Sequence, residues 1–425
     1  MPLGNIVVGL DVGTTKICVI VGKEENGRLK VVSIGTSSSH GIRKGIIVDR
    51  NLVVNSIRKA LKAIEGRTAI PIRSAYVSIA GSHIKGFNGY GAIRIRGRTV
   101  REGDVERLID SAGAAYVPVD REILHVIPKG FRLDGRNGIS NPIGMFGERL
   151  EASVQVITAS TTSIQDLVGC CEEAGVEVSG IVLEPLASAE SVLKKDEKDR
   201  GAALIDIGCG TTGIAVYRDG VLRHAAVLAL GGNHLTNDIA VGLGVSACGA
   251  EEIKKTHGCS LMSLVDENEE IDINDNDKNI KKVPINYLTE IIQLRCEELI
   301  GMVKEETEAY GPKSIILTGG TSLLRGIGEL AEDMFGLPVR IGMPEGMMDR
   351  GLVDSPVYAA GVGLVSYGLT HSRPEDSYEN RENRGYFPYF WQRREKIRNN
   401  EETKISKASP FFERMRYLVS SFLNK

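Results

Sequence analysis

Two glycine- and threonine-rich segments of this chain carry the residue types needed to bind phosphate. They read GLDVGTTKI around Asp11 and LIDIGCGTTG around Asp206, and apolar, β-branched runs flank both. That pattern predicts a β-hairpin whose turn carries the polar residues. Glycines let backbone N–H groups approach phosphate oxygens, and threonine hydroxyls add further donors. Lys16 supplies a positive charge beside the first turn.

The two aspartates have a different role from the glycines and threonines. A carboxylate that faced a phosphate directly would be repelled, so Asp11 and Asp206 are predicted to hold Mg²⁺ through its water ligands. A single motif of this kind also occurs in ordinary hairpins, but two copies of matching layout favour a shared site. The predicted phosphate and metal ligands are Asp11, Gly13, Thr14, Thr15, Lys16, Asp206, Gly208, Gly210, Thr211 and Thr212.

A third glycine-rich turn follows another apolar run. The segment IILTGGTSLLRGI, residues 315–327, places Gly319 and Gly320 between a predicted strand and a predicted helix. Glycines at such a turn leave room for a flat ring or a ribose to approach the backbone. The turn therefore adds a place for the base or sugar of a nucleotide.

The elements around these turns indicate two similar lobes. The repeat of the hairpin motif predicts two sheets, each backed by helices. Residues 51–65 have the apolar spacing of an amphipathic helix. Residues 82–157 form an inserted module with an alternating strand (GAIRIRG), a charged helical stretch at 100–114 and a second strand (LEASVQVITAS). The polar, acidic residues 259–282 favour a solvated surface loop.

The composition excludes several classes of protein. The 425 residues are 42% hydrophobic and 25% charged, which is typical of a soluble globular chain. A formal charge of −3 argues against nucleic acid as a partner, because neutralising phosphates needs a basic surface. The seven cysteines show no CxxC spacing, so we expect reduced thiols in a cytoplasmic chain. The N-terminus lacks the pattern of a signal peptide, and no apolar run reaches about 18 residues, so neither export nor a spanning helix is predicted.

The end of the chain differs in composition from the rest. Residues 371–385 are polar and indicate a flexible linker, whereas residues 386–391 (YFPYFW) concentrate aromatic side chains. A disordered tail is not normally rich in aromatic residues, so we expect parts of it to bind something. The aromatic cluster either contacts a membrane interface or folds back on the core, and both interpretations stay open.

Residues 409–425 are predicted to form an amphipathic helix. Ser409 can cap it, and Pro410 is tolerated at the first helical position. Such a helix docks on its own core or lies in a membrane surface. The phenylalanine bulk, the basic residues of the polar face and the preceding linker favour the membrane. The apolar face consists of Phe411, Phe412, Met415, Leu418, Val419, Phe422 and Leu423.

The order of these motifs resembles the actin, Hsp70 and sugar-kinase ATPases. Members of that superfamily have two phosphate hairpins, an adenosine Gly-Gly turn and two connecting helices rich in small residues. The segments EPLASAESVL at 184–193 and PVYAAGVGLV at 356–365 resemble the connecting helices, whose close crossing would form a hinge. The resemblance implies ATP with Mg²⁺ as the ligand.

Within that superfamily, nearly the whole chain resembles the FtsA family of bacterial cell-division proteins. The resemblance is carried by DVGTTKICVIVG, EPLASAES, IDIGCGTT, GAEEIKKTHG, ILTGGTSLLRGI and SPFFERMRYLVSSFLNK, and most specifically by HVIP…NPIGMFG at 125–147. It implies an α/β, duplicated actin-like (ribonuclease H-like) two-lobed fold with an FtsA-type inserted subdomain. The implied divisions are a lobe 1 core at 1–82 and 161–196, an inserted subdomain at 83–160, lobe 2 at 197–370, a linker at 371–408 and a terminal helix at 409–425.

The resemblance also implies roles for single residues around the nucleotide. Glu251 and Lys254 of GAEEIK would contact the ribose or purine, and Gly319 and Gly320 would lie against adenosine.

Two further residues concern catalysis and loop geometry. Glu184 resembles the connecting-helix acid that orients the attacking water; the alternative is a helix N-terminal residue with no catalytic role. Asp206 would act with it through the metal. Cys209 stands where glycine is common in the family, and it would strain the second phosphate turn if its φ were positive.

The function implied by the resemblance is mainly structural, with weak or slow ATP turnover at most. Family members polymerise on the inner face of the cytoplasmic membrane at the division site, anchor the FtsZ ring through the terminal helix and recruit other division proteins. The alternative is a small-molecule kinase of the same superfamily, which needs a substrate pocket and a positioned base. An Hsp70-like chaperone is disfavoured because the residues after Thr370 are too few for a folded peptide-binding domain.

Overall fold

Each predicted hairpin opens a five-stranded sheet, and the two sheets share one topology. The computed structural model describes residues 6–65, 71–114, 117–274, 280–349 and 351–371. In each sheet, the first three strands along the chain pair antiparallel. The two later strands lie parallel to the first one, on its other side. The first sheet contains β1 (Ile6–Val12), β2 (Lys16–Glu25), β3 (Arg28–Ser38), β6 (Ser74–Ile79) and β11 (Glu177–Leu183). The second contains β12 (Ala202–Ile207), β13 (Thr212–Arg218), β14 (Val221–Leu228), β17 (Ser314–Thr318) and β18 (Val339–Ile341). The predicted duplication is confirmed.

Alternate residues of the first sheet face two different layers. Leu10 and Val19 pack toward α1 (Arg50–Glu65) and α3 (Thr161–Glu173). Their strand neighbours, such as Cys18, pack toward α10 (Ala359–His371). This is the period-two pattern of a sheet covered on both faces. A short hairpin, β4 (Ile42–Arg43) with β5 (Ile46–Ile47), precedes α1.

The second sheet is covered in the same way. Ile205 and Ile214 face the core built with the helices of lobe 2. On the other face, Leu204 and Ala215 pack toward α4 (Glu184–Val192), which follows directly from lobe 1. Lobe 2 also contains α5 (Lys195–Arg200), α6 (Gly232–Leu243), α7 (Ala247–His257), α8 (Ile285–Glu308) and α9 (Ile327–Phe335).

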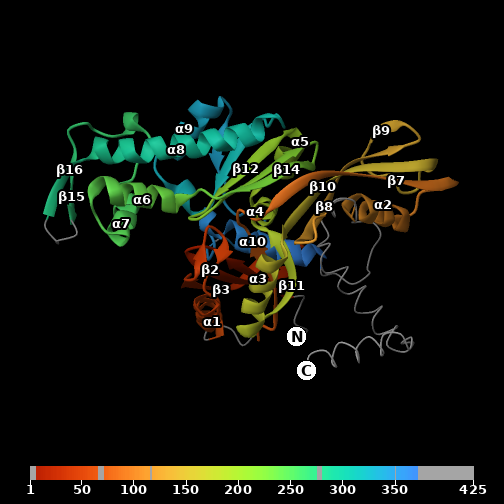
Figure 1. Cartoon of the computed structure of the whole chain (residues 1–425), viewed down its shortest axis with the longest axis horizontal. Helices are drawn as coiled ribbons and strands as arrows, with labels where there is room; N and C mark the ends of the chain where they lie inside the picture. The colour runs from red at the N-terminus through yellow and green to blue at the C-terminus, as the bar shows by residue number, and fades with distance from the viewer. Residues whose placement is uncertain (1–5, 66–70, 115–116, 275–279, 350, 372–425) are drawn as a thin grey trace, which may run out of the picture.

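The helices α4 and α10 cross between the two lobes (Figure 1). A Cβ atom on Gly363 of α10 would overlap the carbonyl of Ala187 in α4, so only glycine allows this approach. Each helix packs on the sheet of the opposite lobe: α4 on lobe 2 and α10 on lobe 1. The lobes are therefore joined by a tight, small-residue crossing, as expected for a hinge.

The inserted subdomain extends to one side of the lobes (Figure 1). Its four-stranded sheet has the order β7-β10-β8-β9, and α2 packs against it around a core of its own. The elements are β7 (Lys85–Thr99), α2 (Glu102–Ala114), β8 (Arg121–Leu133), β9 (Arg136–Ile139) and β10 (Phe146–Ser160).

The expected surface loop at 259–282 is wrong in its second half. After a turn of 3₁₀ helix, η1 (Met262–Leu264), strands β15 (Glu270–Asn274) and β16 (Ile280–Pro284) form an antiparallel pair. Ile271 and Ile273 are buried in the lobe 2 core, whereas Asp272 between them is exposed. The apolar–polar alternation of EIDIN is a strand signal that the high charge of the segment obscured.

The predicted linker begins one residue too early, because His371 is the last residue of α10. The rest of the linker, the aromatic cluster at 386–391 and the terminal helix lie outside the described residues. Within the part of the chain that the structure describes, no helix combines the length and apolar character needed to cross a membrane.

Candidate functional site

The turns of the two hairpins have the same internal geometry. The N–H of Gly13 donates to the carbonyl of Lys16 at 3.0 Å, and the N–H of Gly208 donates to that of Thr211 at 2.9 Å. The flanking pairs, Val12 with Ile17 and Ile207 with Thr212, close turns of equal length. The equivalence places Asp11 and Asp206 at matching positions of the two lobes.

The two turns also contact each other. A Cβ atom built on Gly210 would lie 3.0 Å from the Cβ of Thr14 and closer still to its hydroxyl. By the same equivalence, Cys209 occupies the place of Thr14. Its φ is not among the positive values found for the described non-glycine residues, so the strain considered for Cys209 does not arise.

Two serines hold the aspartates in place. The hydroxyl of Ser78, at the end of β6, donates to Oδ1 of Asp11 at 2.8 Å and accepts the N–H of Val12 at 3.0 Å. The hydroxyl of Ser188, in α4, donates to Oδ2 of Asp206 at 2.5 Å. Both aspartates are buried, with 6% and 4% of their surface exposed. Sequence reasoning missed these serines because they come from distant segments.

The carboxyl groups of Asp11, Glu184 and Asp206 lie near one another at this site. Burial raises the pKa of Asp206 to about 6, and the charge of Asp11 adds to this effect although the Ser188 hydroxyl opposes it. Burial, followed by the charges of Asp206 and Asp11, raises the pKa of Glu184 well above its ordinary value. Burial likewise raises the pKa of Asp11. Two buried aspartates beside a partly buried glutamate repel one another when ionised, and such a group of acids is a favourable place for a divalent cation.

Lys16 links the first turn to the second crossing segment. Its ammonium donates to the carbonyl of Val357 at 2.6 Å and lies 4.7 Å from the ring centre of Tyr358. Both partners belong to η3 (Pro356–Tyr358), the single turn before α10. The lysine therefore connects the first hairpin to the segment before α10, and its charge lowers the pKa of the neighbouring acids against the effect of burial.

The Gly-Gly turn packs against the second hairpin. Gly319 has a φ of 85°, and a Cβ there would overlap a carboxylate oxygen of Asp206. Gly320 begins η2 (Gly320–Leu323), whose Thr321 hydroxyl donates to the carbonyl of Gly208 at 3.1 Å. The third glycine turn thus meets the two hairpins at one place, the candidate cleft of this protein.

A fourth segment at the cleft was not predicted. The N–H of Gly232, the first residue of α6, donates to the carbonyl of Gly208 at 2.9 Å, and the N–H of Asn233 donates to that of Cys209 at 2.7 Å. Gly231 packs on the same two carbonyls. The Gly-Gly pair of LGGNHLT, just before a helical pattern, is the sequence signal that marks this approach.

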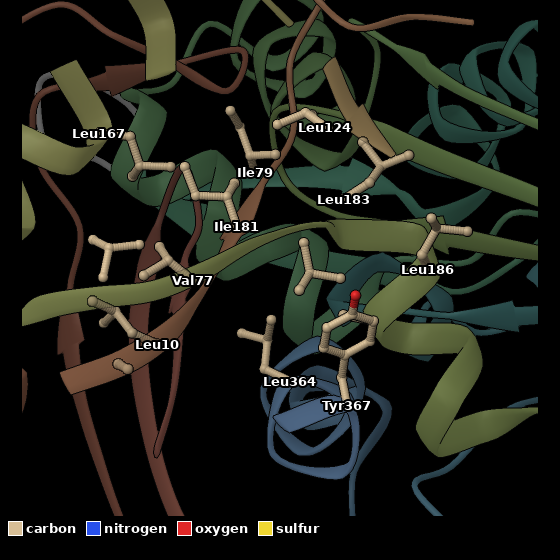
Figure 2. Packing of buried hydrophobic residues seen from close by; sticks show 14 of the residues in the cluster. Leu10, Val77, Ile79, Leu124, Leu167, Ile181, Leu183, Leu186, Leu364 and Tyr367 are labelled. Atoms are coloured by element: carbon tan, nitrogen blue, oxygen red, sulfur yellow. The ribbon is translucent and has the colours of Figure 1, made fainter. Parts of the chain in front are cut away.

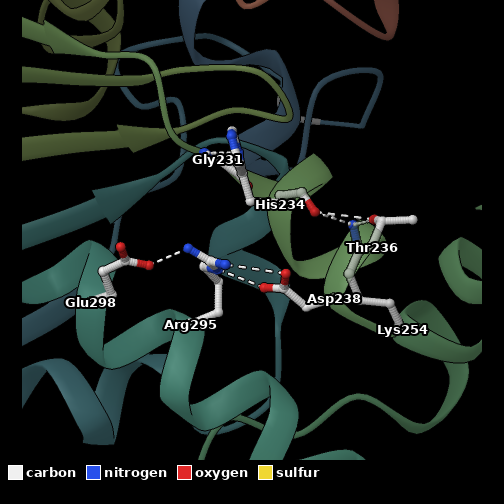
Figure 3. Close-up of polar contacts among 8 residues, drawn as sticks. Gly231, His234, Thr236, Asp238, Lys254, Arg295 and Glu298 are labelled. Carbon is white, nitrogen blue, oxygen red and sulfur yellow. Dashed lines mark hydrogen bonds and ion pairs between the residues drawn. The ribbon is translucent and has the colours of Figure 1, made fainter. Parts of the chain in front are cut away.

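Glu251 and Lys254 join α7 to the start of α6. The Lys254 ammonium donates to the hydroxyl of Thr236 at 2.8 Å (Figure 3). It also donates to the carbonyl of Gly232 at 3.1 Å and lies 2.6 Å from Glu251. The Thr236 hydroxyl is also 2.5 Å from the Glu251 carboxylate. Burial raises the pKa of Glu251, but these partners lower it overall.

The remaining predicted residues are placed less uniformly. Thr14 is partly exposed and Thr15 is exposed at the first turn, and Thr211 is buried at the second. Thr212 is fully buried and its hydroxyl donates to the carbonyl of Leu230, so that hydroxyl is engaged inside lobe 2. Among the described residues, no group of three or more acidic, histidine or cysteine side chains is arranged to chelate a metal directly.

A separate cavity of about 380 Å³ lies away from this cleft. Its lining comes from β8, the β13–β14 turn and the segment after α8, and includes Lys129, Arg223 and Tyr310. None of the cleft residues described above contributes to it.

Comparison with known folds supports the two-lobed assignment. The structure of a PilM–PilN type IV pilus biogenesis complex aligns with a TM-score of 0.64 at 17% identity, covering 87% of this chain and 99% of that one. MreB5 of Spiroplasma citri bound to ADP aligns with a TM-score of 0.52 at 16% identity, covering 85% and 95%. These similarities show the actin-like fold.

Comparison of sequences is more specific. The family model of cell division protein FtsA matches residues 203–363, and that of the SHS2 domain inserted in FtsA matches residues 81–158. Cell division protein FtsA of Pseudomonas aeruginosa is 41% identical over 86% of this chain and 90% of its own length. The Bacillus subtilis and Escherichia coli proteins of the same name are 37% and 34% identical over 87% and 89% of this chain, and over 84% and 94% of their own lengths. With this fold, this insert and relatives of this identity over most of its length, the chain belongs to the FtsA family of actin-like cell division proteins.

Proposed function

We propose that this protein is an ATP-dependent scaffold of cell division. It polymerises as actin-like protofilaments on the inner face of the cytoplasmic membrane, anchors the FtsZ ring there and recruits other division proteins. The main support for ATP binding is the contact between the two glycine turns, Gly210 against Thr14, next to the buried aspartates of both lobes. A ligand placed there contacts both lobes and fixes their relative position.

The residues present fit ATP with Mg²⁺. Backbone N–H groups and the Thr14 hydroxyl can bind phosphate oxygens, and Lys16 can move its ammonium from the Val357 carbonyl to a phosphate. Asp11 and Asp206 would hold Mg²⁺ through its waters, and the cation would stabilise their ionised forms. Bound Mg²⁺ supplies charge neutralisation at the phosphates. The related fold of MreB5, described as bound to ADP, supports a nucleotide in this cleft.

We assign the adenosine side of the cleft to the turn at Gly319 and Gly320 and to helix α7. Gly319 and Gly320 would face the ring, and Glu251 with Lys254 would contact the ribose or purine from α7. Glu184, the first residue of α4, would orient a water toward the phosphates once the cation has lowered its pKa. Because α4 and α10 cross through Gly363, closure around ATP would change the angle of the hinge and thereby the shape that assembles.

The membrane part of the proposal rests on the sequence of residues 409–425. An interfacial helix buries its apolar side chains only partly, so a single copy gives reversible attachment. Several helices on one filament bind far more tightly through effective concentration. Polymerisation and membrane attachment are therefore coupled.

Electron microscopy on lipid monolayers tests the proposal. Filaments are expected on the lipid with Mg²⁺ and ATP, and neither Asp206→Ala nor the chain without residues 409–425 should form them there. The truncated chain should still bind ATP, which separates the membrane role from the nucleotide role. Absence of filaments from the intact protein, together with phosphoryl transfer to a sugar or acid, would instead favour the small-molecule kinase.

A further inference from the structure

The imidazole of His125 connects the inserted subdomain to the nucleotide cleft. The side chain is completely buried, and its Nε2 accepts a hydrogen bond from the backbone N–H of Leu183 at 3.1 Å. His125 belongs to the HVIP segment of β8, the most specific motif of the insert. The nucleotide cleft as described makes no use of this residue.

Strand β8 is shared by two hydrophobic cores. Leu124 and Ile127 pack in the lobe 1 core, where Leu124 and Leu183 both lie in the cluster drawn in Figure 2. Ile123 and Val126, on the same strand, pack in the core of the insert. A displacement of the insert sheet is therefore transmitted along β8 to the position of His125, because closely packed cores move as units.

Leu183 is the point where β11 becomes α4. Its extended backbone (φ −61°, ψ 128°) caps the helix without a side-chain cap, and Glu184 is the first helical residue. The hydrogen bond from Leu183 thus fixes the backbone one residue before the cleft acid. Moving the acceptor moves the start of α4 and the carboxyl of Glu184 with it.

The protonation state of His125 is fixed by its surroundings. Burial, assisted by the charge of His371, lowers the pKa of His125 to about 3, so the ring is neutral at physiological pH. Because Nε2 accepts a hydrogen bond, the neutral ring carries its own proton on Nδ1. Nδ1 has no hydrogen-bond partner among the described residues, and an apolar side chain would avoid that cost.

We propose that His125 is a positioning residue for Glu184, and that through the Leu183 N–H it couples the inserted subdomain to the nucleotide cleft. The coupling works in both directions: nucleotide in the cleft orders β8, and a partner bound to the insert shifts Glu184. The coupling to the nucleotide cleft rests on the proposed ATP site, whereas the positioning of Glu184 by His125 does not.

Hydrogen–deuterium exchange of the full chain without nucleotide tests the positioning. His125→Leu and His125→Asn both remove an acceptor at the Nε2 position, and each should speed exchange of the Leu183 and Glu184 amides by about tenfold. His125→Gln places an amide oxygen near that position and should restore slow exchange. Val303→Ala, which opens a cavity in the lobe 2 core beside α8, is the control for lost core packing and should leave those amides unchanged. If His125→Leu does not fold, the comparison of His125→Asn with His125→Gln still tests whether His125 positions Leu183 and Glu184.

The same measurement with ATP and Mg²⁺ tests the coupling. In the unmodified protein, ATP should slow exchange in both hairpins and also in residues 121–133. In His125→Asn the hairpins should still be protected, but the protection of 121–133 should be lost. Equal exchange at Leu183 in His125→Asn and His125→Gln would overturn the positioning, and retained protection of 121–133 in His125→Asn would overturn the coupling. Absence of hairpin protection in the unmodified protein would contradict the ATP site, while the nucleotide-free comparison still decides the role of His125.

Discussion

Gly210 of lobe 2 lies so close to Thr14 of lobe 1 that a Cβ atom on the glycine would be 3.0 Å from both the Cβ and the Cγ2 of the threonine. Neither φ nor the local turn demands glycine at this position, since the φ of Gly210 is not positive. The constraint comes from the opposite lobe. This contact between the turns therefore depends on the relative position of the two lobes, and adding one methyl group at Gly210 would disturb it.

Gly210→Ala should hold the lobes apart and weaken ATP binding. Overpacking of this kind typically costs about 1–3 kcal/mol, which corresponds to a roughly 5- to 150-fold loss of affinity if the lobes must close on the ligand. Titration with a fluorescent ATP analogue measures the loss. Gly301→Ala in α8 is the control, because a Cβ there meets no atom within 4 Å; it should leave affinity unchanged and raise helix stability slightly. Equal affinities of the two variants would refute a role for the contact in binding.

The hairpins and the Gly-Gly turn were predictable because their signals are local. A strand pattern, an aspartate and a glycine turn lie within about ten residues, and the second copy of the motif repeats the first. The alternation of Ile271 and Ile273 was also present in the sequence, but acidic neighbours concealed it. Composition over a window is a poor guide when every second residue faces solvent.

Contacts between distant segments could not be predicted in this way. Ser78 and Ser188 reach Asp11 and Asp206 from elements 67 and 18 residues away, and His125 reaches Leu183 across 58 residues. Isolated serines and histidines have no period or motif that reveals a partner. Only the folded arrangement of β6, α4 and β8 brings these side chains to their partners.

Asp206 should make the stability of the nucleotide-free protein depend on pH. Its pKa is raised from 3.8 to about 6 in the folded protein, so its contribution to stability is present at low pH and is lost as the pH rises through about 6. At 1.36 kcal/mol per pH unit, the loss amounts to about 3 kcal/mol. Asp206→Asn should be more stable than the unmodified protein at pH 8, by an amount of this order, and similar to it below pH 4.

Chemical denaturation across this pH range measures the effect, with Asp196→Asn as the control. Asp196 is 62% exposed and pairs with Arg200 on the surface, so its replacement should change the free energy of unfolding by less than about 1 kcal/mol. Mg²⁺ with ATP should stabilise the unmodified protein at pH 8 more than Asp206→Asn. A parallel pH dependence for both proteins would mean that Asp206 ionises normally in the fold.

Lys254 and Lys255 should differ sharply although both contact Glu251. Lys254 is buried and bonds to Gly232, Thr236 and Glu251, whereas the Lys255 side chain is 71% exposed and lies 3.2 Å from Glu251. Lys254→Met should cost about 1–3 kcal/mol of stability and about tenfold in ATP affinity, because it leaves buried acceptors unpaired at the start of α6. Lys255→Met should cost at most about 1 kcal/mol. Similar losses for the two variants, by denaturation and nucleotide titration, would contradict the assigned role of Lys254.

The crossing at Gly363 should be the most sensitive position of the hinge. A Cβ there would overlap the Ala187 carbonyl, which is backbone and cannot rotate away, so α4 and α10 must separate. Gly363→Ala should therefore lower stability by about 3 kcal/mol or more, despite the better helix propensity of alanine. Gly103→Ala in α2, where a Cβ would meet nothing within 4 Å, is the matched control and should be neutral or stabilising. Thermal unfolding of both variants measures the difference. If Gly363→Ala folds with the stability of the control, the helices are not in the close contact that the hinge requires, and closure of the cleft must be transmitted by another segment.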